Sequence, residues 1–106
     1  MNEFEMSANN DKQKSPSIEI PINAGSLILK SLEKKFEEEK DELESQDQPE
    51  TRYKIEIIES LLLDGRANKN QLRQSLTRKE GEKFDPASFE DAYCEIEGDV
   101  INYEKK

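Results

Sequence analysis

Three short stretches after residue 52 carry apolar residues at helical spacing, and they leave few folds open to this chain. Residues three, four and seven positions apart lie on one face of an α-helix, so each stretch predicts an amphipathic helix. The apolar positions are Ile55, Ile58, Leu61 and Leu62 in the first stretch, Leu72 and Leu76 in the second, and Phe89, Ala92, Tyr93 and Ile96 in the third. Three such faces close together predict one small helical domain.

Residues that begin and end helices bound these stretches. The signals are Gly65 as a left-handed cap after the first, an Asn68 to Gln71 capping-box pattern before the second, and Asp85-Pro86 as N-cap and first helical residue of the third. We expect Gly98-Asp99 to end the third helix. Val100–Glu104 then predicts a short strand.

The order of these elements resembles the winged helix-turn-helix superfamily. The residues that carry the resemblance are Ile55–Gly65, Asn68–Leu72, Phe89–Gly98 and, as the first wing strand, Val100–Tyr103. The resemblance covers the C-terminal half of the chain. It implies a mainly α fold with a winged-helix-like three-helix domain over residues 51–106 and a short, incomplete wing. Ile18–Ile22 or a strand of another chain would supply the second wing strand.

The N-terminal half predicts a different organisation. Residues 1–16 are polar without periodicity, which indicates a disordered tail. Residues 17–50 form a second segment. In it, Ser17–Ile22 alternates apolar and polar residues and predicts an extended arm or, because its proline cannot donate a ladder hydrogen bond, an edge strand. A long charged α-helix is expected from Ser26 to Ser45, and Pro49 marks the boundary that follows it.

One apolar stripe runs along this expected long helix. Its members are Leu29, Leu32, Phe36 and Leu43. The stripe predicts either a homodimer, in which two such helices pair across a two-fold axis, or packing over Ile57 and Leu63 of the same chain. We favour the dimer, because a long charged helix gains stability from a packing partner.

Charge and composition argue against several classes of protein. The chain is 32% hydrophobic and 39% charged, and its net charge is −9. This balance argues against a large sequence-independent nucleic-acid surface and against anionic membranes as partners. No apolar run approaches the ~20 residues of a membrane span. A single cysteine and an acidic N-terminus without an apolar signal core predict a reducing, cytoplasmic setting.

The chain also lacks the groups that most enzymes use. It has no histidine and one cysteine, Cys94, which we expect to be half-buried and structural. No Cys/His cluster has the spacing of a metal site, and the four glycines are scattered, so no phosphate-binding loop is expected. The sequence therefore predicts a protein that is not an enzyme and carries no cofactor or metal.

The third predicted helix has an acidic exposed side, which phosphates would repel where a winged-helix protein contacts DNA. We therefore expect a protein-docking module, an accessory subunit or adaptor of a DNA- or RNA-handling complex, whose partner has a basic surface. The expected contact residues are Glu90, Asp91 and Glu95 on the third helix, and Glu37, Glu38, Asp41 and Glu42 on the long helix.

Two alternatives remain open on sequence grounds. The first is a DNA-binding transcriptional regulator that contacts phosphates weakly through the basic second helix and the loop after it. Its contacts would be Lys69, Arg73, Arg78, Lys79 and Lys83. The second is an acidic nucleic-acid mimic that inhibits a DNA-binding enzyme, although lysines interspersed in the long helix dilute its negative field.

Overall fold

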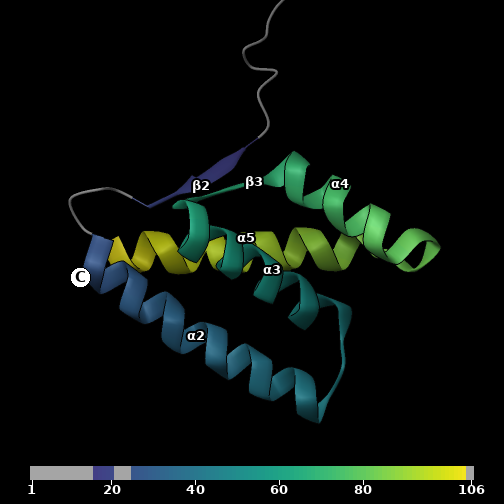
Figure 1. Ribbon diagram of the computed structural model, residues 1–106, viewed down its shortest axis with the longest axis horizontal. Helices are drawn as coiled ribbons and strands as arrows, with labels where there is room; N and C mark the ends of the chain where they lie inside the picture. Colours follow the sequence, from purple (N-terminus) through teal and green to yellow (C-terminus); the bar gives the residue numbers. More distant parts are fainter. Residues whose placement is uncertain (1–15, 21–24, 105–106) are drawn as a thin grey trace, which may run out of the picture.

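The structure is a computed structural model that describes residues 16–20 and 25–104. It is mainly α-helical, with a small two-stranded antiparallel sheet at one edge (Figure 1). In this part of the chain the elements are strand β2 (Ser17–Glu19), helices α2 (Gly25–Ser45) and α3 (Pro49–Asp64), strand β3 (Arg66–Asn68), helix α4 (Lys69–Glu80), the 3₁₀ helix η2 (Gly81–Lys83) and helix α5 (Pro86–Glu104). The tail expected over residues 1–16 lies outside the described residues apart from Pro16.

Cap geometry confirms the predicted end of α3 and the predicted starts of α4 and α5, whereas α3 itself begins earlier than expected, at Pro49. Gly65 has a left-handed backbone, with φ of 76°, directly after α3. The Asn68 side chain accepts a hydrogen bond from the backbone N–H of Gln71 at 3.0 Å, which caps α4. At the start of α5, the Asp85 carboxylate accepts from the Ser88 hydroxyl at 2.8 Å and from two backbone N–H groups. These local signals place α4 and the start of α5 where the sequence predicted them.

One hydrophobic core joins all four helices to the small sheet. Helix α3 packs against α5 and also against α2, so it lies at the centre of the helical packing. The buried members are Ile18, Ile28, Leu32, Tyr53, Ile57, Ile58, Leu61, Ala67, Leu76, Phe89, Ala92, Tyr93, Ile96 and Val100. The core therefore includes residues on both sides of the boundary expected after residue 50. That position lies inside α3, and the break between α2 and α3 covers residues 46–48.

The small sheet pairs the N-terminal strand with an unexpected partner. Strands β2 and β3 run antiparallel, with Ile18 opposite Ala67. Both side chains are buried, and the Tyr93 hydroxyl donates to the backbone oxygen of Ala67 at 3.2 Å. The strand expected within Ser17–Ile22 is thus confirmed over Ser17–Glu19, while its last two residues lie outside the described part. Its partner is the short segment that links α3 to α4, for which no strand was predicted.

The expected wing strand at Val100–Glu104 is wrong, because α5 continues as a helix through these residues. Gly98 does not end the helix either: among the described glycines, only Gly65 and Gly81 have positive φ. The continuation follows from packing. Val100 and Tyr103 extend the apolar face of α5 by one more turn, with Val100 buried and Tyr103 packed against the core.

The inward face of α2 differs from the predicted stripe. Ile28 and Leu32 are fully buried, Phe36 packs partly against the core, and Leu29 and Leu43 are half-buried. Leu32 is therefore used within one chain and has no surface left for a second copy. Packing on the same chain therefore describes α2 better than pairing with a second copy. Of the two partners expected for this packing, Ile57 is buried, whereas Leu63 is 77% exposed and lies outside the core.

The C-terminal end of α4 is fastened to α3 by a compact polar cluster. The Glu80 carboxylate accepts from Arg52 Nε at 3.0 Å and from the Tyr53 hydroxyl at 2.7 Å. The same hydroxyl accepts from the backbone N–H of Asp85 at 3.0 Å. Since the Tyr53 ring is buried against Phe84 and Phe89, the cluster fixes the end of α4 on the core.

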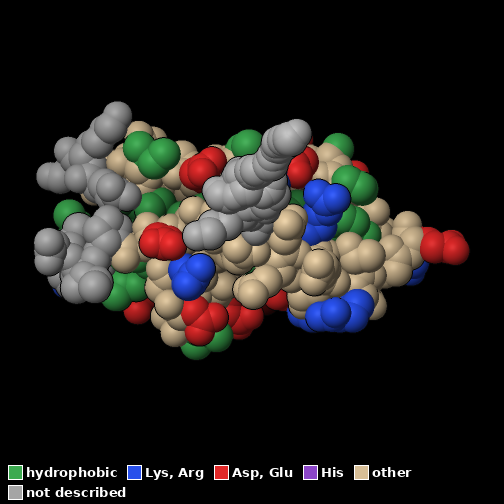
Figure 2. All heavy atoms as spheres, turned by 90° about the horizontal axis from the view of Figure 1, so that it is seen from above, with side chains coloured by type: hydrophobic (Ala, Val, Ile, Leu, Met, Phe, Trp, Pro, Cys, Tyr) green, Lys and Arg blue, Asp and Glu red, His purple; other side chains and the backbone are tan. Residues whose placement is uncertain are grey.

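Charged side chains are distributed unevenly on the face that carries β2 and α4. Figure 2 shows that most of the Lys and Arg side chains visible there lie in the half that holds α4. Acidic side chains dominate the other half of that view. Positive and negative side chains are thus separated on this face, although the chain as a whole has a net charge of −9.

Candidate functional site

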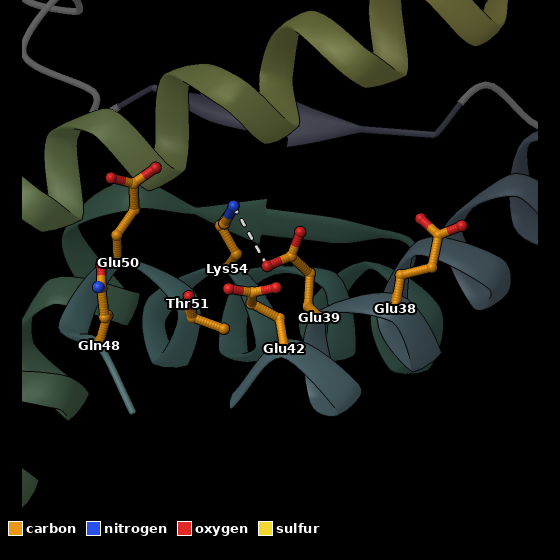
Figure 3. Close-up of a pocket in the computed structure, with 7 residues that line it drawn as sticks. All are labelled: Glu38, Glu39, Glu42, Gln48, Glu50, Thr51 and Lys54. Atoms are coloured by element: carbon orange, nitrogen blue, oxygen red, sulfur yellow. Dashed lines mark ion pairs between the residues drawn. The ribbon is translucent and has the colours of Figure 1, made fainter. Parts of the chain in front are cut away.

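An open cleft of about 370 Å³ lies where the C-terminal half of α2 meets the start of α3. The polar break at residues 46–48 turns the chain back, so the two helices bring their charged side chains together. The residues that line the cleft are Glu38, Glu39, Glu42, Gln48, Glu50, Thr51 and Lys54 (Figure 3). Four carboxylates therefore surround one ammonium group.

The ammonium group of Lys54 is already occupied by internal partners. Its Nζ lies 3.2 Å from Glu39 Oε1 and 3.2 Å from Glu95 Oε2. The side chains of Lys54 and Glu39 are each only 12% exposed. Within the described part of the chain, the other three carboxylates of the cleft, on Glu38, Glu42 and Glu50, form no ion pair. The cleft therefore keeps an uncompensated negative charge.

A half-buried network of five charged groups joins α2, α3 and α5 behind this cleft. Lys35 Nζ lies 3.0 Å from both Glu95 and Asp99, and it also pairs with Glu39 at 3.8 Å. Burial acts to lower the pKa of Lys35 and Lys54, but hydrogen bonds from their ammonium groups to carboxylates outweigh it and raise both pKa values. Burial raises the pKa of Glu95, yet its two lysine partners bring it below its ordinary value. The network thus keeps its groups charged inside the fold.

The acidic face predicted for the third helix is only partly available. Glu90 is paired with Lys69 at 2.6 Å, and Glu95 belongs to the interhelical network. Asp91 is exposed. The structure thus does not bring Glu90, Asp91 and Glu95 together as one outward-facing acidic surface, because internal lysines hold two of them.

The acidic residues predicted on the long helix remain at the surface. Glu37, Glu38, Asp41 and Glu42 are all exposed, and Glu37 makes a long ion pair of 3.9 Å with Lys40. Only Glu38 and Glu42 line the cleft. The predicted set is thereby divided between the cleft and the outer side of α2.

The basic residues predicted to contact nucleic acid also divide into two groups. Lys69 is held by Glu90 and lies 5.4 Å from the centre of the Tyr93 ring, while Lys79 pairs with Glu56 at 3.2 Å. The other members, Arg73, Arg78 and Lys83, are exposed and form no ion pair among the residues the structure describes.

Sequence reasoning missed the α3 side of the cleft and the inward charges of α2. The sequence predicts a boundary at Pro49 after the long helix, whereas Pro49 lies in the first turn of α3 and so brings Glu50 and Thr51 into the cleft. A signal for the inward charges was present. Lys35 follows Leu32 by three positions and Ile28 by seven, and Glu39 follows Leu32 by seven, so both share the buried face of the helix.

Cys94 is exposed, so the expectation of a half-buried structural cysteine is wrong. It lies one position beyond the buried Tyr93, on the outer side of α5. In the part of the chain that the structure describes, no group of three His, Cys, Asp or Glu side chains could hold a metal ion. None of the described helices has the length and apolar character needed to span a bilayer.

Comparison of the chain with family models, with characterised proteins and with solved structures found no significant match.

Proposed function

We propose that this protein is a non-enzymatic docking module that binds a basic segment of a partner protein in the cleft between α2 and α3. The observation that carries the proposal is the excess of carboxylates there. Among the described residues, Glu38, Glu42 and Glu50 line the cleft without a cation of their own, and Lys54 is held by Glu39 and Glu95. A lysine or arginine side chain from a partner would supply the missing charge.

The size and polarity of the cleft favour a side chain of a protein over a buried small molecule. Small-molecule sites are concave and mostly apolar, with a few polar groups, whereas this cleft is open and lined by charged and polar residues. An ammonium or guanidinium group can form charge-assisted hydrogen bonds with two carboxylates at once. Because the site is exposed, salt would weaken the attraction, and charge complementarity would act chiefly on the rate and orientation of binding.

We infer that the winged-helix resemblance extends to the three helices of the C-terminal half and not to a wing. The chain order of α3, α4 and α5 supports it, since three helices in this order follow the pattern from which the resemblance came. The role as an accessory subunit or adaptor in a DNA- or RNA-handling complex follows from this resemblance only by analogy of fold.

A binding experiment with a matched control tests the docking site. The probe is a fluorescent peptide of alternating lysine and glycine, and its anisotropy is measured at low salt. The triple variant Glu38→Gln, Glu42→Gln and Glu50→Gln is expected to bind about tenfold more weakly, because it removes three carboxylates from one cleft. The control variant removes three exposed carboxylates elsewhere, by Glu33→Gln, Glu59→Gln and Glu82→Gln.

The control separates a site from general attraction. Equal losses in both triple variants would mean that the peptide responds only to net charge, and the cleft would then have no special role. Charge reversal at Asp91, the exposed member of the set Glu90, Asp91 and Glu95, tests the acidic helix predicted from the sequence, because the other two carboxylates form internal ion pairs. If that variant loses binding while the cleft variant keeps it, the contact surface lies on α5.

A further inference from the structure

We propose that helix α4 is a second docking surface, independent of the acidic cleft, and that its occupant is duplex DNA. The exposed cations Arg73, Arg78 and Lys83 would contact phosphates, and the exposed amides of Asn70 and Gln74 would face the base edges of the major groove.

Helix α4 is positively charged, whereas the chain as a whole is negatively charged. Residues 69–79 contain four cations and no acidic residue, in a protein whose net charge is −9. The one acidic residue of the helix, Glu80, points its carboxylate to Arg52 and Tyr53 of α3. The outer side of α4 is therefore positive, and Figure 2 shows cationic side chains gathered on this half of the molecule.

The chemistry of the outer side of α4 is that of a surface that contacts bases. Leu76 is buried and Leu72 packs partly against the core. The residues exposed on the other side are Asn70, Gln71, Arg73, Gln74, Thr77 and Arg78. Amide side chains can pair with adenine and guanidinium groups with guanine in the major groove. Such a helix side, free of acidic and large apolar residues, fits a nucleic acid better than an apolar protein groove.

Helix α4 is anchored to the rest of the fold at both ends, which would lower the entropic cost of binding. Its start is fixed by the Asn68 cap and by the ion pair of Lys69 with Glu90, which lies at the base of the helix. Its end is fixed by Glu80 on Arg52 and Tyr53. The surface ion pair of Lys79 with Glu56 adds a further contact with α3.

The position of α4 in the fold also separates it from α5, the helix that a winged-helix protein would offer to DNA. In Figure 1, α4 lies at the outer edge, whereas α5 runs through the middle of the molecule. Phe89, Tyr93 and Ile96 turn one side of α5 into the core, and its acidic residues Glu95 and Asp99 pair with Lys35 of α2. One side of α5 is thus taken up by internal contacts, and its exposed carboxylate Asp91 would repel phosphates, whereas the exposed side of α4 carries no acidic residue.

Duplex DNA is favoured over other anionic partners by the shape of the helix. The major groove of B-form DNA admits an α-helix, whereas the major groove of A-form RNA is too deep and narrow to be read by side chains. Three exposed cations predict weak binding, with a slope of the logarithm of affinity against the logarithm of salt concentration of about −3. The negative cleft lies on other elements, α2 and α3, so a duplex on α4 would not need to cross it.

The test compares two double variants of the full chain with the same loss of charge. Anisotropy of a fluorescent, random-sequence DNA duplex is followed against protein concentration at several low salt concentrations. Arg73→Gln with Arg78→Gln is expected to weaken binding about tenfold and to reduce the steepness of the salt dependence by about 2. The control, Lys30→Gln with Lys34→Gln on the exposed side of α2, is expected to stay within about twofold of the wild type.

Each other outcome overturns the proposal. No binding by the wild-type protein at low salt would exclude α4 as a DNA surface. Equal losses of affinity in both double variants would mean that the duplex responds only to the net charge of the protein. Displacement of the duplex by polyglutamate at equal charge would point to an acidic protein as the partner. Equal binding of single-stranded DNA would exclude docking in a groove. The cleft variant Glu38→Gln, Glu42→Gln and Glu50→Gln should retain DNA binding, so this proposal and the docking function fail separately.

Discussion

Lys69 Nζ lies 2.6 Å from Glu90 Oε1, so the first cation of α4 is neutralised by an acidic residue of α5. Each residue had been assigned to a different partner on sequence grounds, one to phosphates and the other to a basic protein. In the fold, each serves as the partner of the other. The ion pair joins the start of α4 to the first half of α5, and it therefore has a structural role.

Replacement of Lys69 by Met should change stability only slightly. The Glu90 side chain is 45% exposed, so solvent screens the pair, and the expected loss is below about 1 kcal/mol. Urea denaturation followed by circular dichroism measures it. DNA affinity, if α4 binds a duplex, should fall less than in Arg73→Gln, because the Lys69 charge is already used. A larger fall for Lys69→Met would mean that the ion pair opens when DNA binds.

Replacement of Lys54 by Met should be more costly. Lys54 is only 12% exposed and pairs with Glu39 and Glu95 from two other helices. Its removal leaves partly buried carboxylates without their cation, and we expect a loss of about 2 kcal/mol in the free energy of unfolding. Lys30→Met, on the exposed side of α2, is the matched control and should change little. A loss in Lys54→Met no greater than in this control would contradict a stabilising role for the network.

The parts of the fold that could be predicted from the sequence are those with local causes. The Asn68 cap, the Asp85 cap and the left-handed Gly65 depend on residues within a few positions, and all three occur as expected. The buried side of the third helix could also be predicted, because Phe89 and Ile96 follow a helical period. Local chemistry is sufficient to decide such features.

The features that were missed have non-local causes. Gly98-Asp99 resembles a helix end, yet packing of Val100 and Tyr103 on the core carries α5 past it. The pairing of β2 with β3 depends on residues about fifty positions apart, and no short pattern specifies it. The acidic cleft likewise arises only when the break after α2 brings Glu42 and Glu50 to one place. The number of charges along the sequence does not show which charged side chains become neighbours in the fold, and the cleft depends on those neighbours.

Stability should fall in acid, and Glu80 should account for part of the loss. Burial raises the pKa of Glu80, but hydrogen bonds from Arg52 and Tyr53 outweigh it and hold the pKa below the ordinary value of 4.5. The unfolded chain therefore binds this proton at a higher pH than the folded chain. The contribution of Glu80 is complete above about pH 4.5 and disappears as the pH falls through the lower, folded-state pKa.

Urea denaturation at a series of pH values measures this effect. Glu80→Gln should lower stability by about 1 to 2 kcal/mol at neutral pH and by progressively less in acid. Glu82→Gln, an exposed carboxylate two residues away, is the control and should follow the wild-type curve. Parallel acid curves for the wild type and Glu80→Gln would show that this carboxylate contributes nothing to the pH dependence.

Replacement of Gly98 by Ala decides between a continuous α5 and the wing that the sequence suggested. Gly98 lies inside the helix without a positive φ, and a Cβ there would meet no atom within 4 Å. Alanine should therefore stabilise the protein by about 0.5 to 1 kcal/mol, since it favours the helix over the unfolded chain.

Gly65→Ala is the matched contrast for this experiment. A Cβ at Gly65 also has open space, but φ there is +76°, so the left-handed backbone should cost about 1 to 2 kcal/mol. Thermal or urea denaturation of both variants gives the sign of each change. If Gly98→Ala destabilises the protein as Gly65→Ala does, residue 98 lies in a turn and Val100–Glu104 is free to form the strand of a wing. Stabilisation by Gly98→Ala would instead show that the helix runs through this position. The higher helix propensity of alanine stabilises the protein only if residue 98 is helical.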